Sequence, residues 1–207
     1  MNFKITRKQF QNTRTMNTKI KSIIQASIDL KTKVLNDSEL TETIQNIVDQ
    51  IIHCYENGGK VLFCGNGGSA ADAQHLAAEL SGRFYFDRHP LFAEALHVNS
   101  SYVTAVANDY GFDEVFARLV LAMGSKDDIL IGLSTSGNST NILRAFDEAN
   151  TLGMITVGFT GENGGKLKEK SSYLLNIPST DTPRIQEVHI MLGHIICELV
   201  EAKLFKD

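Results

Sequence analysis

The N-terminal part of the chain carries two segments in which apolar residues recur at every third or fourth position. These segments, IKSIIQASIDL and ELTETIQNIVDQIIHCY, have the spacing of amphipathic helices. Asn36-Asp37-Ser38 lies between them and supplies residues that end one helix and cap the next. We therefore predict two helices over residues 17–57, which either build an oligomer or pack on the chain's own sheet. Residues 1–16 show little pattern and are expected to form a flexible arm.

Short apolar runs separated by segments of helical spacing make up the rest of the chain. The first run, residues 61–64, follows Gly58-Gly59, a pair that ends the preceding helix. Runs at residues 95–98, 127–133, 154–160 and 173–177 predict four more strands, and helical segments are expected near 70–82, 101–121, 139–152 and 183–205. Because strands and helices alternate, we predict a three-layer α/β domain over residues 58–207 with a mainly parallel, five-stranded sheet.

Composition and charge narrow the class of protein. The 207 residues are 43% hydrophobic, which is enough for one globular domain with its own core. Cys54, Cys64 and Cys197 are an odd number in apolar surroundings, which indicates a reducing compartment rather than a disulfide framework. The N-terminus is polar and no apolar run is long enough to span a membrane, so we expect a soluble, cytoplasmic protein. The net charge of −4, without a basic stripe, argues against nucleic acid as a partner.

Two loops stand out at the carboxyl ends of predicted strands, where parallel α/β sheets bind their ligands. Residues 65–69 follow the first strand, within CGNGGSAADAQHLAAEL, and residues 133–140, LSTSGNST, follow the third. Both loops place glycine and small hydroxyl residues at the start of a helix. Hydroxyls and unpaired backbone N–H groups in this position suit a phosphate monoester. The alternative is that the serines only cap the helix and the glycines only turn the chain.

The first loop also matches the dinucleotide fingerprint G-x-G-x-x-[GA] through Gly65, Gly67 and Ala70. That fingerprint requires an acidic residue at the end of the second strand, which is expected to end in His97-Val98-Asn99 instead. A Walker loop is excluded because no Gly-Lys-Ser/Thr follows. A phosphate on a smaller molecule therefore fits the two loops better than a nucleotide.

Two predicted helices carry side chains suited to acid/base chemistry or metal binding. His75 and Glu79 are four residues apart and share one face of the helix that follows the first loop. In the last helix, Gln186 and His194 differ by about 80° around the axis, whereas His189 lies about 140° from His194. The alternative for His75 and Glu79 is an exposed helix pair. We interpret the remaining histidines as packing or surface residues: His53, His89, His97 and His189.

Four blocks of the sequence, taken together and in order, resemble the phosphoheptose isomerases of the sugar isomerase (SIS) superfamily. They are GKVLFCGNGGSAADAQHLAAELSGRF, VANDYGFDEVF, GLSTSGNSTNIL and PRIQEVHIMLGHIICELVE, and the resemblance covers residues 40–203. It implies a flavodoxin-like SIS fold and a cytoplasmic homotetramer with active sites at subunit interfaces. It also implies an enzyme that interconverts sedoheptulose 7-phosphate and D-glycero-D-manno-heptose 7-phosphate. This reaction is the first step towards nucleotide-activated heptose for surface polysaccharide such as lipopolysaccharide or capsule.

The same resemblance implies roles for residues in these blocks. Glu79 and His194 match the family's acid/base pair, and members that bind zinc do so at the positions of His75, Glu79, Gln186 and His194. The serines of both loops, with Thr135, would hold the phosphate, and Arg83 would reach the sugar, across a subunit boundary. This chain has Pro183 where some members carry an acidic residue, with Asp181 two positions earlier. The residues implied in substrate binding are Asn66, Gly67, Gly68, Ser69, Arg83, Asn108, Asp109, Ser134, Thr135, Ser136, Ser139 and Gln186.

On this interpretation, we expect Glu79 to move the carbon-bound proton through an enediol and His194 to serve the sugar oxygens and ring opening. Two other functions stay open: isomerisation of another ketose phosphate, and non-catalytic binding of the kind carried out by replication-initiator-associating SIS proteins. Those binding proteins lack the catalytic residues, so the presence of Glu79 and His194 favours an enzyme. A sugar-phosphate-sensing regulator would need a DNA-binding domain or a basic patch, for which the chain has neither the length nor the charge.

Overall fold

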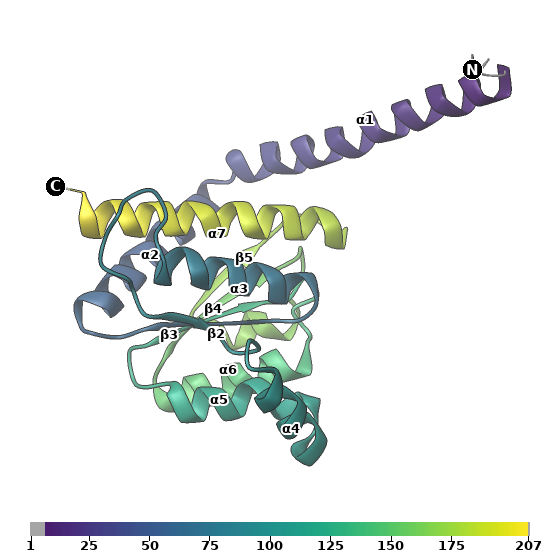
Figure 1. Ribbon diagram of the computed structural model, residues 1–207. Helices are drawn as coiled ribbons and strands as arrows, with labels where there is room; N and C mark the ends of the chain where they lie inside the picture. The colour runs from purple at the N-terminus through teal and green to yellow at the C-terminus, as the bar shows by residue number, and fades with distance from the viewer. Residues whose placement is uncertain (1–6, 207) are drawn as a thin grey trace.

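A five-stranded parallel sheet forms the centre of the structure, a computed structural model that describes residues 7–206, with side chains from residue 15 onwards (Figure 1). The strand order is β2-β1-β3-β4-β5, and all neighbouring strands run parallel. This order reverses direction between β1 and β3, which is where flavodoxin-like sheets bind their ligands. The strands are β1 (Val61–Gly65), β2 (Ala93–Ala95), β3 (Ile129–Leu133), β4 (Ile155–Thr160) and β5 (Tyr173–Asn176).

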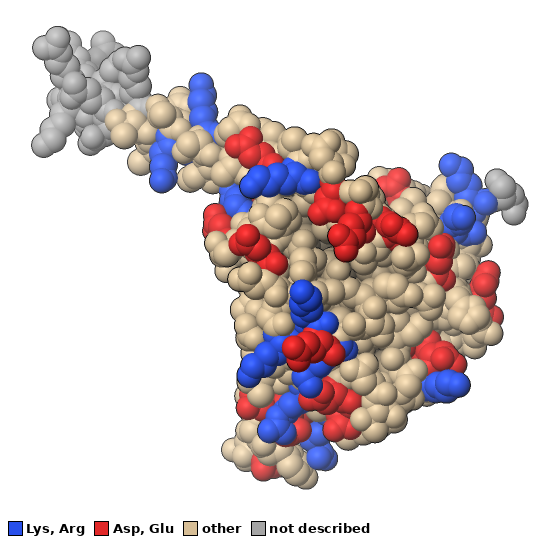
Figure 2. All heavy atoms as spheres, turned by 180° about the vertical axis from the view of Figure 1, so that it is seen from behind, with Lys and Arg blue, Asp and Glu red and all other residues tan. Residues whose placement is uncertain are grey.

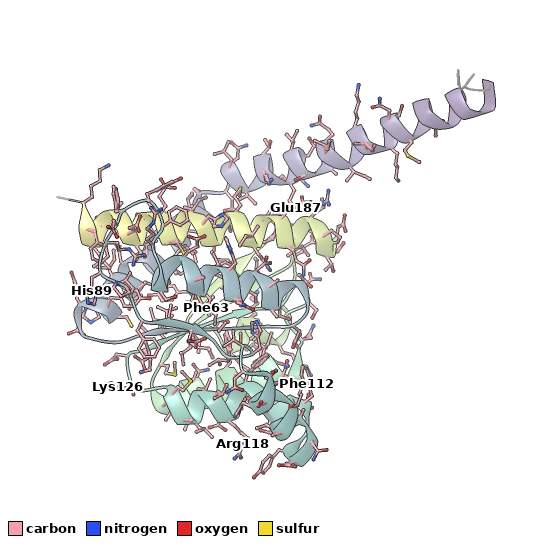
Figure 3. The ribbon with its side chains drawn as sticks, in the orientation of Figure 1. Phe63, His89, Phe112, Arg118, Lys126 and Glu187 are labelled. Carbon is pink, nitrogen blue, oxygen red and sulfur yellow. The ribbon has the colours of Figure 1, made fainter. Side chains whose placement is uncertain are left out.

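Helices cover both faces of the sheet, which confirms the predicted three-layer α/β fold (Figure 1). Within β1, Phe63 packs in the core on the α3 side (Figure 3), while its neighbour Leu62 packs in the core on the opposite side of the sheet. Both faces of the strand are therefore buried, which explains its continuous apolar sequence. One layer holds α1 (Arg7–Leu35), α2 (Ser38–Glu56), α3 (Gly68–Ser81) and α7 (Thr182–Phe205); the other holds α4 (Ser100–Tyr110), α5 (Val115–Met123) and α6 (Thr140–Leu152).

The break between α1 and α2 lies where the sequence predicts it. Asp37 is the N-cap of α2, and its carboxylate accepts a hydrogen bond from the Leu40 backbone N–H at 3.0 Å. The start of α1 is a correction, because the helix begins at Arg7 and residues 7–16 are helical rather than an arm. No glycine or proline interrupts RKQFQNTRTM, and its Arg, Lys and Gln residues favour a helix. Residues 1–6 of the expected arm lie outside the described residues.

Helix α1 projects away from the body of the domain (Figure 1, Figure 2). Its middle part is attached to the first turns of α7, since Ser27 Oγ donates a hydrogen bond to Glu187 Oε2 (2.7 Å) and the Arg184 guanidinium donates one to the Ile23 carbonyl (3.2 Å). Arg184 and Glu187 also form an ion pair with each other at 2.6 Å. None of the described helices, α1 included, combines the length and the apolarity of a membrane span.

The second strand is shorter and earlier than predicted, at Ala93–Ala95 instead of residues 95–98. The Leu96 N–H still donates to the Phe63 carbonyl (2.9 Å), but the chain then turns and Val98 is exposed. The apolar residues of this run are therefore divided between the strand and the turn that leads to α4, whose N-cap is Asn99.

The single helix predicted over residues 101–121 is also a correction, because the structure divides it into α4, a 3₁₀ turn at Phe112–Glu114, and α5. Gly111 separates the two helices with a φ of +94°, a backbone conformation that ends α4 and that residues other than glycine rarely adopt. The spacing of apolar residues continues across this break, so the pattern alone does not reveal it.

His189 is fully buried beneath the carboxyl edge of the sheet, as a packing residue, in agreement with the prediction that it lies apart from the site. Its Nε2 is 3.1 Å from the Thr160 carbonyl oxygen, and its ring meets Phe159 edge to face. Burial lowers the pKa of His189 from 6.5 to about 4, against the weaker opposing effect of the Thr160 carbonyl. The imidazole is therefore neutral in the folded protein near neutral pH.

We expect this histidine to make the protein less stable in acid. The unfolded state takes up the proton near pH 6.5 and the folded state only near pH 4, so its contribution to stability is present above the unfolded pKa and is lost as pH falls towards the folded one. Between about pH 7 and about pH 4.5 the loss should be roughly 2 kcal/mol. This loss is measured as the difference in the free energy of unfolding between the two pH values, from urea unfolding of the wild type and of His189→Gln. An equal acid loss in both proteins would contradict the assignment.

Candidate active site

The two predicted ligand loops lie side by side at the carboxyl edge of the sheet. Strands β1 and β3 are neighbours with Gly65 opposite Leu133, so the chain leaves both strands at the same level. The side-chain amides of Asn66 and Asn141 exchange two hydrogen bonds of 2.9 Å and tie the loops together. Asn141 is 3% exposed, and sequence reasoning did not single it out, although an asparagine in the first turn of a predicted helix was the available signal.

The first loop brings the start of α3 against the first turns of α7. Gly67 occupies the N-cap position of α3 with a φ of +57°, and no side chain caps this helix. A Cβ atom at Gly68 would lie 2.7 Å from Gln186 Nε2, so the glycine allows Gln186 to approach the loop. Gln186 Nε2 also lies 3.5 Å from Ser69 Oγ, a hydroxyl that is 4% exposed. The predicted substrate residues Gly67, Gly68, Ser69 and Gln186 are thus brought together.

In the second loop, the hydroxyl at the start of the helix is turned away from capping it. Ser139 occupies the N-cap position of α6, yet its side chain makes no capping bond and lies 3.0 Å from Ser134 Oγ instead. Gly137, with a φ of +65°, lets the loop pack tightly against Gly164. A cavity of about 270 Å³ adjoins the loop and is lined by Thr135 and Ser136 together with residues after β4 and β5. These features favour an anion-binding role over simple capping.

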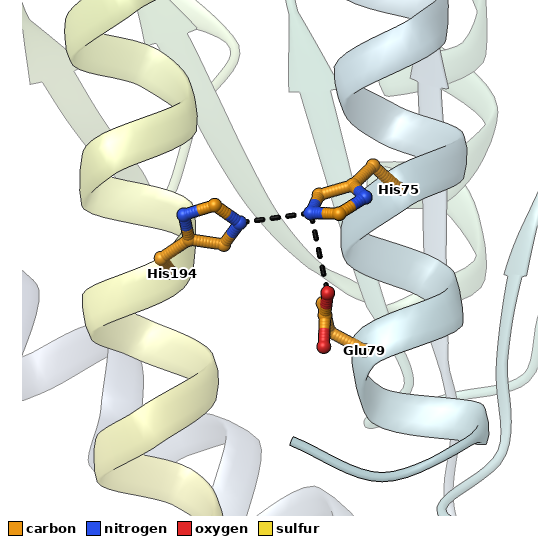
Figure 4. A group of neighbouring side chains, drawn as sticks. All are labelled: His75, Glu79 and His194. Carbon is orange, nitrogen blue, oxygen red and sulfur yellow. Dashed lines mark hydrogen bonds and ion pairs between the residues drawn. The ribbon is translucent and has the colours of Figure 1, made fainter. Parts of the chain in front are cut away.

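His75, Glu79 and His194 form a cluster between α3 and α7 (Figure 4). His75 Nε2 lies 2.8 Å from His194 Nε2 and 3.2 Å from Glu79 Oε1. One ligand atom from each side chain lies within 4.8 Å of the others, so the group could hold a metal ion. Side chains that are 119 residues apart in the sequence therefore converge within one chain.

The close approach of α3 and α7 at this cluster depends on Gly193. A Cβ atom at this position would lie 2.4 Å from Leu76 Cδ1, so a larger residue would push the helices apart. Leu76 and Gly193 are the sequence neighbours of His75 and His194, and both are buried. The apolar contact beneath the cluster thus sets the distance between its two imidazoles.

Asp72 is a further carboxylate beside the cluster that the sequence analysis did not select. Burial raises its pKa, and the nearby His75 and His194 oppose this effect. Its buried Oδ2 has no hydrogen-bond partner among the described residues. The available signal was helical spacing, since Asp72, His75 and Glu79 are three and four residues apart.

Three predicted site residues are not drawn into the loops or the cluster. Arg83 is exposed in the segment after α3, and Asn108 and Asp109 are exposed on α4, where Asn108 Nδ2 donates to Asp109 Oδ1 at 2.9 Å. No hydrogen bond or ion pair among residues 15–206 connects these three side chains to the cluster or to either loop. Their predicted contact with a sugar stays a prediction.

The other histidines have the positions of surface and packing residues. His53 is exposed and lies 3.3 Å from the side chain of Asn57, and His89 is exposed beside Pro90 (Figure 3). His97 is partly buried after β2, and burial lowers its pKa. None of the three joins the His75 cluster.

Comparisons with known proteins find similar sequences and a similar fold. A family model described as SIS domain matches residues 24–161. A phosphoheptose isomerase from Clostridium acetobutylicum is 50% identical over 188 residues, which are 91% of this chain and 96% of that protein. A phosphoheptose isomerase from Mycobacterium tuberculosis is 54% identical over 183 residues, covering 88% and 93%. The solved structure of a phosphoheptose isomerase from Francisella tularensis matches with a TM-score of 0.86 and 40% identity, covering 89% of this chain and 97% of that one.

Proposed function

Because the chain belongs to the SIS-domain family and, within it, to the phosphoheptose isomerases, we propose that the loops and the cluster divide the work of one sugar-phosphate isomerisation. The enzyme interconverts sedoheptulose 7-phosphate and D-glycero-D-manno-heptose 7-phosphate. The observation that carries the division of roles is the convergence of Glu79 and His194 between α3 and α7. Non-catalytic binding gives no reason for this convergence.

The phosphate of the substrate would bind at the second loop. Ser134, Ser136 and Ser139 offer hydroxyls there, and the start of α6 offers backbone N–H groups to which the N-cap residue Ser139 makes no capping bond. A helix N-terminus favours an anion without a lysine, by about 0.3–1 kcal/mol when exposed and more when partly buried. Ser69, next to Gln186 in the first loop, would complete the contact from the neighbouring strand. The sugar would then extend from this loop towards the cluster.

The reaction requires two proton movements. One proton leaves the carbon beside the carbonyl and returns to the neighbouring carbon, and a second passes between the two oxygens of an enediol. The Glu79 carboxylate would carry the carbon-bound proton, and the His194 imidazole would exchange the proton of the oxygens and open the sugar ring. Each positioned group is worth about 10²- to 10⁴-fold in rate. The two groups come from different helices but lie within 4.8 Å of one another, so both can reach neighbouring atoms of one substrate.

The cluster also has the donor set for zinc. His75 and His194 supply imidazole nitrogens and Glu79 supplies a carboxylate oxygen, with Gln186 as the further ligand that the family resemblance implies. The two imidazole nitrogens lie 2.8 Å apart, so both are close enough to be directed at one ion. When bound, zinc would polarise the sugar carbonyl and stabilise negative charge on the enediolate.

Oligomerisation would explain the surface of α1. Ile20, Ile24 and Ile28 repeat every four residues and are about half exposed, although they form an apolar stripe on a projecting helix. An apolar groove of about 590 Å³ lies between α1, α2 and α7 and includes Ile195 and Leu199. A second copy of α1 has the length and apolarity to cover this surface. We propose a homotetramer in which Arg83 of one copy serves the site of its neighbour.

Glu79→Gln tests the acid/base assignment. The amide cannot take up the carbon-bound proton, so turnover of sedoheptulose 7-phosphate should fall by about 10²- to 10⁴-fold or more. Binding of the substrate by calorimetry and the melting temperature should stay close to the wild type, because the change keeps the shape of the side chain. A fully active Glu79→Gln protein would remove this carboxylate from the mechanism.

Metal removal tests the zinc assignment. After treatment with a chelator, turnover of sedoheptulose 7-phosphate should drop and then recover when Zn²⁺ is added, but not when Mg²⁺ is added, because the cluster offers imidazole nitrogens. Titration of Zn²⁺ into the chelated protein should give one site per chain, and His75→Ala should lose it. Full activity at undetectable metal content would refute a catalytic role for zinc.

Ile24→Asp tests the role of α1. A charge in the middle of the apolar stripe should dissociate the oligomer, because it would be buried without a partner. Light scattering after size exclusion gives the mass. Ser22→Asp is the matched control, since Ser22 is exposed on the opposite side of the same helix and should leave the mass unchanged. If Ile24→Asp keeps the wild-type mass, or if the wild type itself is a monomer, the proposed role of α1 in oligomerisation is wrong.

A further inference from the structure

A buried ion pair outside the cluster joins α7 to the segment that follows α3. Glu201, on α7, is fully buried, and the Arg88 side chain is 2% exposed. Arg88 Nε donates to Glu201 Oε1 at 2.9 Å. Neither residue belongs to the loops or the cluster, and their burial leaves no route for contact with substrate.

Glu201 organises the backbone of the segment after α3. Its Oε1 accepts a hydrogen bond from the Phe84 N–H (2.9 Å), and its Oε2 accepts from the N–H groups of Tyr85 (2.6 Å) and Phe86 (3.1 Å). Burial acts to raise the pKa of Glu201, but these hydrogen bonds and the one from Arg88 outweigh it and hold the pKa below its usual value. The carboxylate is therefore charged and fully bonded in the folded protein.

Arg88 fixes the end of α3 with its remaining donors. Nη2 donates to the Glu79 carbonyl at 3.0 Å, and Nη1 donates to the Leu80 carbonyl at 2.9 Å and, more weakly, to the Gly82 carbonyl at 3.3 Å. The Glu79 and Leu80 carbonyls lack partners within the helix because they belong to its last turn, and Gly82 is the C-cap residue. One guanidinium thus binds the backbone of the residue that carries the proposed catalytic carboxylate.

The same pair reaches the proposed catalytic imidazole from the other side. Glu201 follows His194 by seven residues, about two turns along the same face of α7. The ring of Phe84, whose N–H is held by Glu201, lies 5.9 Å from the His194 ring. In Figure 1 the segment after α3 crosses the C-terminal half of α7, the helix that carries both His194 and Glu201.

We propose that Glu201 and Arg88 are positioning residues for the isomerisation: they hold α3 and α7 at the separation that brings Glu79 to His194, and they seat Phe84 against the His194 ring. This inference rests on the proposed function of that site. Stability alone does not require two buried charges here, because apolar residues of similar size often replace a buried ion pair without loss. The geometry of the site does require the two charges, because an apolar pair cannot bind three backbone N–H groups and the carbonyls at the end of a helix at once.

Glu201→Gln and Asp128→Asn form a matched comparison. Asp128 is 2% exposed, pairs with Lys60 Nζ at 2.6 Å and accepts from the N–H groups of Lys60 and Ser125. It precedes β3 and so lies at the amino edge of the sheet, opposite the loops. Both changes remove one buried charge and keep the shape of the side chain. Both should lower the melting temperature, so a difference in activity between the two variants cannot be explained by loss of stability.

The two variants should differ in catalysis. Glu201→Gln should lower kcat by about 10²-fold with little change in KM, because a shift of the order of an ångström between acid and base costs that much. Asp128→Asn should keep the wild-type kcat at temperatures where both variants are folded. Wild-type kcat in Glu201→Gln, or an equal loss in Asp128→Asn, would overturn the proposal. If Glu201→Gln does not fold, Arg88→Lys replaces it, since lysine keeps the charge but cannot bind the α3 carbonyls and Glu201 together.

A measurement without substrate separates this inference from the proposed function. Zn²⁺ titrated into the chelated wild type reports the spacing of His75, Glu79 and His194 directly. Glu201→Gln should weaken Zn²⁺ binding by about tenfold or more, as changes to supporting residues commonly do, while Asp128→Asn should not. If the wild type binds Zn²⁺ but does not turn over the heptose phosphate, the proposed function fails and the positioning role is still tested. Equal Zn²⁺ affinity in both variants overturns the positioning role.

Discussion

The packing of α3 against α7 is the contact on which the rest of the site depends. Gly193 presents no side chain, and Leu76 fills the space that a larger residue would occupy. Burial of a leucine contributes about 1.5–3 kcal/mol, so the helices gain stability from the same contact that fixes their distance. Their neighbours His75 and His194 consequently meet at 2.8 Å, although each is attached to a different part of the sheet. A hydrophobic contact thus sets the geometry of a polar site.

Much of this architecture follows from local sequence patterns. Continuous apolar runs identified β1 and β3, because strands buried on both faces have no polar alternation. Glycine and serine after each strand marked the two loops, and the parallel topology requires their carboxyl ends to share one edge. Helical spacing placed His75 with Glu79 on one face, and the angle around α7 separated His189 from His194. These inferences concern neighbours in sequence, for which the period of the element determines the geometry.

Features that depend on distant contacts were not predictable in this way. The spacing of the last helix cannot say which element it packs against, so the meeting of His194 with His75 required the resemblance or the structure. The same holds for the Asn66–Asn141 pair and for Arg88 with Glu201, whose partners lie 75 and 113 residues apart. The end of β2 and the break at Gly111 were missed for a related reason. Their apolar residues continue through the turns, and only packing decides where regular structure stops.

The attachment of α1 to α7 would link the proposed association of copies to ligand binding. Arg184 and Glu187, which hold Ile23 and Ser27, stand on either side of Gln186 in the sequence, and Gln186 faces Ser69. In the proposed homotetramer, a neighbouring copy bound to α1 would therefore also act on the helical turn that presents Gln186. By thermodynamic linkage, if such a neighbour strengthens ligand binding by some factor, the ligand strengthens the association of the copies by the same factor. Protein concentration, which sets the association of the copies, and substrate concentration would then both affect the enzyme through the same turn of α7.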